Sequence, residues 1–346
     1  MDKREEYAIG IRTDANDKIA MGHLVRCMSI AKQLRNIGQN ILFIISEQYA
    51  KDYITENGFE CICLDNRYNE KESEVENLIR ILEDYNIKKL LLDSYEVTYS
   101  YMEKLKQQTK LIYLDDINHF RYPADIIINY ADSANILQYE GKGYEEEIFL
   151  LGSQFVPLRP EFQEAAIRVN EKVERIFLTT GGTDSFHMIL SILNEMKKNG
   201  LKTIEKHVVT GKFYGDLTEL KEMAAKDESI KVYHDISDVC TVMKMCDMAI
   251  SAGGTTMIEL CACGIPTICF TMAENQIPAT KAFEKKGIIQ YAGDIGNGNQ
   301  KVADNIIKNI LLLMKDYECR KDLAHKARAT VDGRGANRIA ERIVEL

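Results

Sequence analysis

The sequence predicts an α/β protein built on parallel, doubly wound sheets, and three observations indicate this. Short runs of Val, Ile, Leu and Phe alternate with amphipathic stretches of a dozen or more residues along the whole chain. These runs are apolar throughout rather than alternating, as expected of parallel strands covered by helices on both faces. The β-α-β-α order also occurs twice within the 346 residues, which indicates two domains, since single cores rarely exceed roughly 250–300 residues.

Each half contributes a series of expected strands. In the first half the strands are expected at 7–12, 41–46, 89–93, 111–115 and 126–129. The first two are joined by a predicted helix whose residues Leu24, Cys27, Ala31 and Leu34 repeat at three and four residues and form one apolar stripe. In the second half the strands are expected at 175–180, 207–210, 230–233, 248–251 and 267–270.

The boundary between the halves is expected where Pro157 and Pro160 stiffen the chain, because proline does not fit inside a sheet. This places an N-terminal domain at 1–160 and a C-terminal domain at 161–346. Residues 316–346 are predicted to form terminal helices, the last of them starting after 332–335. That these helices return to the N-terminal domain stays open.

Composition excludes several classes of protein. The net charge is −9 and no Lys/Arg run is present, so a nucleic-acid partner is not expected. The longest apolar stretches, such as 41–45, are far shorter than the roughly 18 residues of a membrane span, and the charged residues 1–6 do not form a signal peptide. Nine cysteines, an odd number without C-x-x-C spacing, indicate reduced thiols rather than disulfides or a zinc site. We therefore expect a cytoplasmic protein without membrane insertion or a bound metal, of open oligomeric state.

The loop after the first strand carries the first candidate site. Ligands of parallel sheets bind beyond the carboxyl ends of the strands. Gly22 allows backbone conformations that are closed to other residues, and His23 is expected to lie at or near the first turn of the following helix. The positive helix end disfavours imidazolium, so His23 is predicted to be neutral and able to accept a proton. The alternative is a histidine that only caps or packs at the helix start.

Two glycine pairs in the second half predict an anion-binding site. Gly181-Gly182 and Gly253-Gly254 each lie between a strand and a helix, where backbone amides can approach phosphates closely. Glu259, one turn into the second of these helices, is placed to bind a ribose diol. Without a ligand, the glycine pairs could simply form tight turns between strand and helix, and Glu259 could be an acidic residue that stabilises the start of its helix. The pattern is not G-x-G-x-x-G, so no dinucleotide is implied.

Further candidates follow other strands. Asn275 and Gln276 could contact sugar hydroxyl or acetamido groups, although Asn275 could also cap a helix. Asp93 and the Asp115-Asp116 pair end strands of the first half. Neighbouring side chains of an extended chain point to opposite sides, so one member of the aspartate pair is expected to be structural.

Taken together, these segments resemble the PseG/SpsG family, the sugar-nucleotide hydrolases of pseudaminic acid biosynthesis and the spore-coat polysaccharide proteins, whose relatives include the MurG-like glycosyltransferases. The matching pieces occur in family order along the chain: Arg12-x-Asp14, Gly22-His23-x-x-Arg26-Cys27, Asp93-x-Tyr95, Asp115-Asp116, Leu158-Arg159-Pro160-Glu161-Phe162, Gly181-Gly182-x-Asp184, Ala252-Gly253-Gly254-Thr255-Thr256-x-x-Glu259, Gly264-x-Pro266, Asn275-Gln276 and Asp332-Gly333-x-Gly335.

The resemblance implies a GT-B fold, with two Rossmann-like domains facing a central cleft. It implies metal-independent hydrolysis of a UDP-linked 2,4-diacetamido-2,4,6-trideoxyhexose to the free sugar and UDP, in nonulosonic (pseudaminic) acid or surface polysaccharide biosynthesis. His23 is implied as the base that activates water, with Asp14 and Asn275 as further catalytic-site residues. The implied nucleotide-sugar contacts are Gly22, Gly181, Gly182, Ile236, Gly253, Gly254, Thr255, Glu259 and Gln276.

Two other functions remain open on the sequence. An inverting GT-B glycosyltransferase would use the same UDP site and base, with an acceptor hydroxyl in place of water. A non-catalytic nucleotide-sugar binder would keep the glycine loops and Glu259 without needing His23. The small-molecule partner expected in all three cases is a nucleotide sugar.

Overall fold

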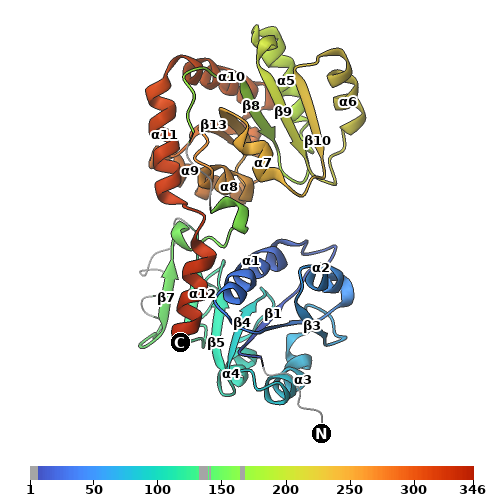
Figure 1. Cartoon of the computed structure of the whole chain (residues 1–346), viewed down its shortest axis with the longest axis vertical. Coiled ribbons are helices and arrows are strands. Elements are labelled where there is room, and N and C mark those ends of the chain that lie inside the picture. The colour runs from blue at the N-terminus through green and yellow to red at the C-terminus, as the bar shows by residue number, and fades with distance from the viewer. Residues whose placement is uncertain (1–6, 132–138, 140–141, 164–167) are drawn as a thin grey trace. The chain divides into compact units, whose positions relative to one another are not determined.

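The computed structural model describes residues 7–131, 139, 142–163 and 168–346, so the charged segment 1–6 lies outside the described residues. The chain divides into two compact units (Figure 1). Unit 1 consists of residues 1–160 and 334–346, and unit 2 of residues 161–333.

Unit 1 is a seven-stranded sheet, every paired strand of which is parallel, in the order β3-β2-β1-β4-β5-β6-β7. The strands are β1 (Ile9–Thr13), β2 (Ile41–Ile45), β3 (Glu60–Cys63), β4 (Lys89–Asp93), β5 (Lys110–Leu114), β6 (Ile126–Asn129) and β7 (Ile148–Leu151). The helices are α1 (Gly22–Asn36), α2 (Lys51–Glu56), α3 (Lys71–Asp84), α4 (Tyr99–Lys106) and α12 (Gly335–Glu345).

Unit 2 is a six-stranded parallel sheet in the order β10-β9-β8-β11-β12-β13. The strands are β8 (Arg175–Thr179), β9 (Glu205–Thr210), β10 (Ile230–His234), β11 (Met248–Ala252), β12 (Thr267–Thr271) and β13 (Gln290–Asp294). The helices are α5 (Met188–Lys198), α6 (Leu217–Lys226), α7 (Val239–Lys244), α8 (Thr255–Ala262), α9 (Ile277–Lys285), α10 (Asn299–Lys315) and α11 (Tyr317–Thr330).

The predicted class of parallel, doubly wound sheets is confirmed. All ten expected strands form, and three more, β3, β7 and β13, lie at sheet edges. Edge strands are covered less fully and carry polar residues, as in β3, where no residue is fully buried. β3 and β13 therefore lack a continuous apolar run, whereas β7 is apolar along its whole length although it lies at an edge.

The last helix, α12, completes the core of unit 1. Ile339, Ala340 and Ile343 are buried in the same cluster as Leu24 and Leu34 of α1, and the two helices lie side by side in Figure 1. Gly335 starts α12 so close to the preceding chain that an added Cβ would lie 2.1 Å from the Val156 carbonyl oxygen. The glycine is therefore required by backbone packing.

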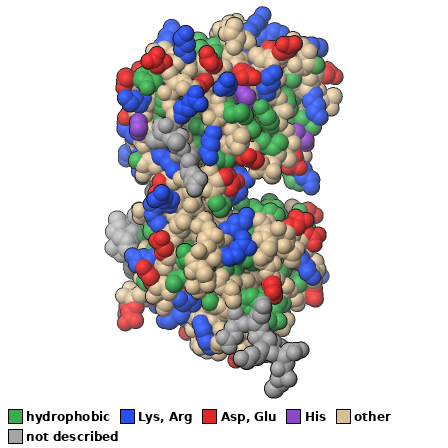
Figure 2. All heavy atoms as spheres, in the orientation of Figure 1, with side chains coloured by type: hydrophobic (Ala, Val, Ile, Leu, Met, Phe, Trp, Pro, Cys, Tyr) green, Lys and Arg blue, Asp and Glu red, His purple; other side chains and the backbone are tan. Residues whose placement is uncertain are grey.

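Charged side chains of both signs are interspersed on the face seen in Figure 2. The described helices include none that is long and apolar enough to cross a bilayer. All nine cysteines are free thiols, as their spacing predicts.

Candidate functional site

Both sheets have a point at which the strand order reverses. In unit 1 the chain leaves β1 toward β2 on one side and later returns to form β4 on the other, and β8 and β11 have the same relationship in unit 2. Loops that follow two such strands diverge and leave a crevice beyond the carboxyl ends, which is where open α/β sheets bind ligands. The loops that contain His23 and the two glycine pairs all follow these strands.

In unit 1 this position holds a His–Asp pair. His23 lies in the first turn of α1 and is 9% exposed, and its Nδ1 is 2.6 Å from Oδ1 of Asp93 at the end of β4. An ionised carboxylate can only accept a hydrogen bond, so Nδ1 carries the proton that it donates to Asp93. In the neutral ring Nε2 is then the nitrogen free to accept a proton. Whether His23 is neutral, as predicted from its helix start, stays a prediction.

Arg26 holds Asp93 in place from the next turn of α1. Its Nε donates to Asp93 Oδ2 at 2.6 Å and its Nη1 to Asp116 Oδ2 at 2.6 Å. Burial alone would raise the pKa of Asp93, but the charge of Arg26 and hydrogen bonds from Arg26 and His23 outweigh burial and keep this pKa below its ordinary value. Asp93 is therefore a carboxylate, as the His23 tautomer requires.

Tyr95 adds a third contact to this group. Its hydroxyl donates to Asp116 Oδ2 at 2.6 Å, and its ring meets the His23 ring edge-on with centroids 4.6 Å apart. The neighbouring Asp115 is fully buried and accepts hydrogen bonds from the backbone amides of 117 and 118 and from the Tyr139 hydroxyl. One member of the aspartate pair is thus structural, as expected, and Asp116 is the one that joins the site.

Asp14 lies in a buried cluster of charges beside the same site. Its Oδ2 is 2.6 Å from Lys71 Nζ and 2.9 Å from Arg12 Nη1, and its Oδ1 accepts from the Ser46 amide at 2.7 Å. Burial would raise the pKa of Asp14, but the charges of Arg12 and Lys71 and the hydrogen bonds from both together outweigh burial and hold this pKa well below its ordinary value. Because both oxygens are occupied and the group stays ionised, this arrangement suits a positioning role better than proton transfer.

The structure does not use the backbone freedom that Gly22 allows. Gly22 lies within α1 and its φ is not positive; instead Ala20, two residues earlier, has φ 56° and closes a tight turn by pairing with Asn16. A Cβ at Gly22 would meet nothing within 4 Å. The surface in front of it is therefore open.

A small cavity lies beside His23, and we call it the water recess. Its volume is about 20 Å³, and its lining consists of Asp14, Ile19, His23, Tyr68, Asp93, Ser94, Tyr95 and Glu96. A polar cavity needs roughly 10–15 Å³ to hold one water molecule. The water recess therefore has room for a single water next to the His–Asp pair.

In unit 2 the loop after β8 differs from the expected helix-start geometry. Helix α5 begins only at Met188, and the Asp184 carboxylate already accepts the amides of Met188 and Ile189, both at 2.9 Å. The Gly181-Gly182 turn therefore does not present the α5 amides to a ligand. Gly181 has φ 88°, a conformation that favours glycine.

The loop after β11 leads directly into a helix start. The amides of Gly253 and Gly254 donate to the carbonyls of Phe270 and Ala252, at 2.9 Å each. The first-turn amides of α8 at Thr255 and Thr256 are the ones that helix geometry leaves without an acceptor inside the helix. An anion at this loop is thus expected to meet these two amides rather than those of the glycines.

Two of the four glycines have no structural need to be glycine. At Gly182 and Gly254 an added Cβ would meet nothing within 4 Å, and neither residue has a positive φ. Close approach of a ligand to the backbone is one reason for glycine at such a position. Gly253, by contrast, is required by packing, because its Cβ would lie 2.2 Å from Thr280 Oγ1.

The remaining predicted contacts lie on neighbouring loops of unit 2. Glu259 is half-buried one turn after Thr255 on α8. Asn275 is exposed in the 3-10 turn Glu274–Gln276 after β12, and Gln276 Oε1 accepts the Met272 amide at 2.9 Å, which fixes this loop. Ile236 is half-buried in the loop after β10. All of these loops follow carboxyl ends of the same parallel sheet.

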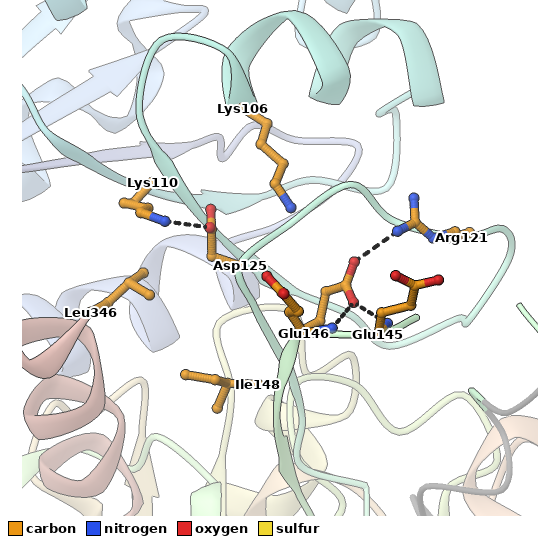
Figure 3. Close-up of a pocket in the computed structure, with 9 residues that line it drawn as sticks. Lys106, Lys110, Arg121, Asp125, Glu145, Glu146, Ile148 and Leu346 are labelled. Carbon is orange, nitrogen blue, oxygen red and sulfur yellow. Dashed lines mark hydrogen bonds and ion pairs between the residues drawn. The ribbon is translucent and has the colours of Figure 1, made fainter. Parts of the chain in front are cut away.

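A larger cavity of about 480 Å³ lies at the opposite end of the unit 1 sheet (Figure 3). Lys110 and Ile148 at its wall begin β5 and β7, so it lies at the amino ends of the strands. Its charges are largely paired with one another, as in Lys110 with Asp125 at 3.0 Å and Arg121 with Glu147 at 2.8 Å. Volume alone therefore does not identify the functional site.

Within the described ranges, no group of three or more His, Cys, Asp and Glu side chains is placed to hold a metal ion. Sequence reasoning named Asp93 only as a further candidate and did not single out Arg26, so it missed the pairing of both with His23. Asp93 and Arg26 belong to the matching motifs, and the position of Asp93 at the end of a strand was the available signal. The strand order that brings it to His23, however, becomes visible only in the fold.

Comparisons with known proteins agree with this architecture. Residues 176–343 match the family model described as glycosyltransferase family 28 C-terminal domain. The crystal structure of MurG from Acinetobacter baumannii superposes with a TM-score of 0.71 at 12% identity, covering 98% of this chain and 99% of that one. The predicted GT-B fold is confirmed.

The relatives in sequence are distant. The spore coat polysaccharide biosynthesis protein SpsG of Bacillus subtilis is 23% identical over 347 residues, covering 98% of both chains. The UDP-2,4-diacetamido-2,4,6-trideoxy-beta-L-altropyranose hydrolase of Campylobacter jejuni is 22% identical over 289 residues, 80% of this chain and 96% of that one. An uncharacterised protein of Methanocaldococcus jannaschii is 26% identical over 295 residues, and the match spans 58% of its length. The predicted resemblance is confirmed.

Proposed function

Because this chain is a relative of the PseG and SpsG proteins, with a C-terminal part similar to glycosyltransferase family 28, we propose that it hydrolyses a UDP-linked sugar to the free sugar and UDP. The sugar proposed is a diacetamido-trideoxyhexose, the type named for the Campylobacter relative. The reaction would serve pseudaminic acid or surface polysaccharide biosynthesis.

The observation that carries the proposal is the His–Asp pair next to a cavity for one water. In the proposed reaction His23 Nε2 takes a proton from that water as its oxygen attacks the anomeric carbon. Asp93 holds the ring in the required tautomer and stabilises the imidazolium that forms, as a carboxylate does in other His-based catalysts. A positioned general base of this kind contributes typically 10²–10⁴-fold to the rate.

The nucleotide is assigned to unit 2. The first-turn amides of α8 would bind the pyrophosphate, and Glu259, one turn later, would accept hydrogen bonds from the ribose hydroxyls. Gly182 and Gly254 leave the backbone open for the phosphates. Charge that develops on the departing UDP is then stabilised by the helix end, so the proposed reaction runs without a metal.

The second candidate is an inverting glycosyltransferase, which the family 28 match favours. It would use the same nucleotide site and the same base. The difference is the nucleophile, since an acceptor alcohol replaces water.

The test is incubation of the purified protein with the UDP-linked diacetamido-trideoxyhexose in the absence of any acceptor. We expect UDP and free sugar to appear in equal amounts, detected by anion-exchange chromatography and mass spectrometry, and a chelator to leave the rate unchanged. Release of UDP only after an acceptor alcohol is added would favour the transferase instead. A panel of other UDP- and CMP-linked deoxyamino sugars serves as the specificity control.

A further inference from the structure

Resting on the proposed function, we infer that Ile19 and Tyr68 make the site select water over an alcohol. Both residues line the water recess beside His23 and Asp93. The chain would then release free sugar because its nucleophile site is too small for an acceptor hydroxyl and the carbon attached to it.

The size of the water recess is the first argument. The recess is partly open to solvent, and the roughly 20 Å³ of it that a water molecule can reach exceeds the space needed for one water by only a small margin. An alcohol must place its oxygen where the water sits and its carbon against the wall. In a site of fixed size each added carbon can cost one to two orders of magnitude in rate.

The rigidity of the wall is the second argument. Ile19 belongs to the tight turn from Asn16 to Ala20, whose backbone is held by Asn16 Oδ1, which accepts from the amides of Lys18 at 2.9 Å and Ile19 at 3.1 Å. The backbone at Ile19 is therefore held by its own turn rather than by the substrate.

A single carboxylate connects this turn to the second wall. Glu47 Oε2 accepts from Asn16 Nδ2 at 3.0 Å, and its Oε1 accepts from the Tyr68 amide at 3.4 Å. Glu47 follows β2, so the strand end anchors both segments. The backbone segments on both sides of the recess, almost 50 positions apart, are thereby tied to one side chain.

Hydrolysis and transfer to an alcohol differ only in the nucleophile. With water, the oxygen forms a bond to the anomeric carbon, the bond from that carbon to the UDP oxygen breaks, and His23 takes the proton. With an alcohol the same bonds form and break and the same proton moves, but the product is an alkyl glycoside. The product ratio therefore reports the selectivity of the site directly.

The test uses methanol as the alcohol, added to the full-length protein with its UDP-sugar, and measures UDP, free sugar and methyl glycoside by mass spectrometry. For the native chain we expect a ratio of methyl glycoside to free sugar at least roughly tenfold below the molar ratio of methanol to water. Ile19→Ala should raise that ratio about tenfold or more while UDP release continues. Ile37→Ala, an exposed isoleucine of the same unit at the end of α1, is the matched control and should behave as the native chain.

The inference would be overturned if the native chain formed methyl glycoside and free sugar in the molar ratio of methanol to water, or if Ile19→Ala left the product ratio unchanged. The proposed function would still stand in either case, because UDP is released. Absence of UDP release from the native chain would refute the proposed function itself. If Ile19→Ala does not fold, Tyr68→Ala opens the other wall, and an unchanged ratio in that variant would equally contradict the selection of water.

Discussion

His23 is the residue on which the proposed chemistry rests. His23→Ala removes the base but leaves unit 2, to which UDP is assigned, untouched. We expect the turnover number to fall by at least about a hundredfold with little change in UDP affinity. Steady-state kinetics and calorimetric UDP titration check this, with His325→Ala on α11 as the matched control. An unchanged rate would remove His23 from catalysis.

The buried carboxylates of unit 1 predict sensitivity to acid. The pKa values of Asp93, Asp14 and Glu74 all lie below their ordinary values because neighbouring cations outweigh the effect of burial. A carboxyl with a lowered folded-state pKa stabilises the fold above its unfolded-state pKa and loses this contribution as the pH falls toward the folded value. The free energy of unfolding of unit 1 should therefore drop steeply below about pH 4.

Urea unfolding at a series of pH values between about 7 and 3 measures this effect. Asp93→Asn should be less stable at neutral pH, because Arg26 loses a buried partner, and its stability should depend less on pH. Asp52→Asn, an exposed residue of α2, serves as the control and should keep the native pH dependence. Equal slopes for all three proteins would refute the assignment.

The site is only partly predictable from sequence at this scale. His23 could be selected because a polar loop and a glycine precede a predicted helix. Its pairing with Asp93, 70 positions later, depends on the order of the strands in the sheet. The local sequence around His23 does not determine that strand order. The same holds for the ion pair of Asp14 and Lys71, 57 positions apart, which suits a positioning role of Asp14 better than proton transfer.

At the scale of elements, the loop that leads into α8 is tightly packed. Gly253→Ala would bring a Cβ to 2.2 Å from Thr280 Oγ1, so either the β11–α8 loop or α9 has to shift. We expect a loss of about 1–3 kcal/mol in stability and weaker UDP binding. Gly254→Ala is the matched control for folding, because its Cβ meets open space and should affect only UDP binding.

A double substitution tests the cause of this loss. Thr280→Ala removes the Oγ1 that the new Cβ would meet, so Gly253→Ala combined with Thr280→Ala should regain part of the stability that the single glycine change loses. Urea unfolding of the four proteins gives the coupling free energy. Additive losses would show that the contact with Thr280 is not the reason for the glycine.

A comparison of central and edge strands shows which elements can be predicted from the sequence. Central strands such as β4 and β11 are covered on both faces and largely apolar, and nine of the ten expected strands are central; the tenth, β10, lies at a sheet edge. Edge strands are half-covered: β13, Gln290–Asp294, contains Gln, Gly and Asp and resembles a loop in composition. The expected phosphate loop at Gly181 was likewise displaced from its helix because Asp184 caps α5.

At the scale of the whole molecule, the two units differ in whether one continuous fragment of the chain contains all of their residues. Unit 2 is continuous from 161 to 333, whereas unit 1 needs α12 to cover its core. We expect a 161–333 fragment to unfold cooperatively and bind UDP. A 1–160 fragment should lack a cooperative transition, because each buried isoleucine lost with α12 costs about 2–5 kcal/mol.

Circular dichroism during urea unfolding and UDP calorimetry measure these outcomes. A fusion that joins residue 160 to residue 334 by a short flexible linker is the matched control and should restore cooperative unfolding, since Gly335 lies against the Val156 backbone. A 1–160 fragment as stable as the fusion would refute the role assigned to α12.

The return of α12 to unit 1 also sets an order of assembly during synthesis. A ribosome produces the seven strands of the first sheet early, but the helix that covers them emerges only after every residue of unit 2 has been made. Since domains generally fold as units while the chain is growing, unit 2 can reach its native state first. The half of the protein that is translated first is therefore the half that is finished last, and a chaperone would meet its uncovered α1 surface throughout that interval.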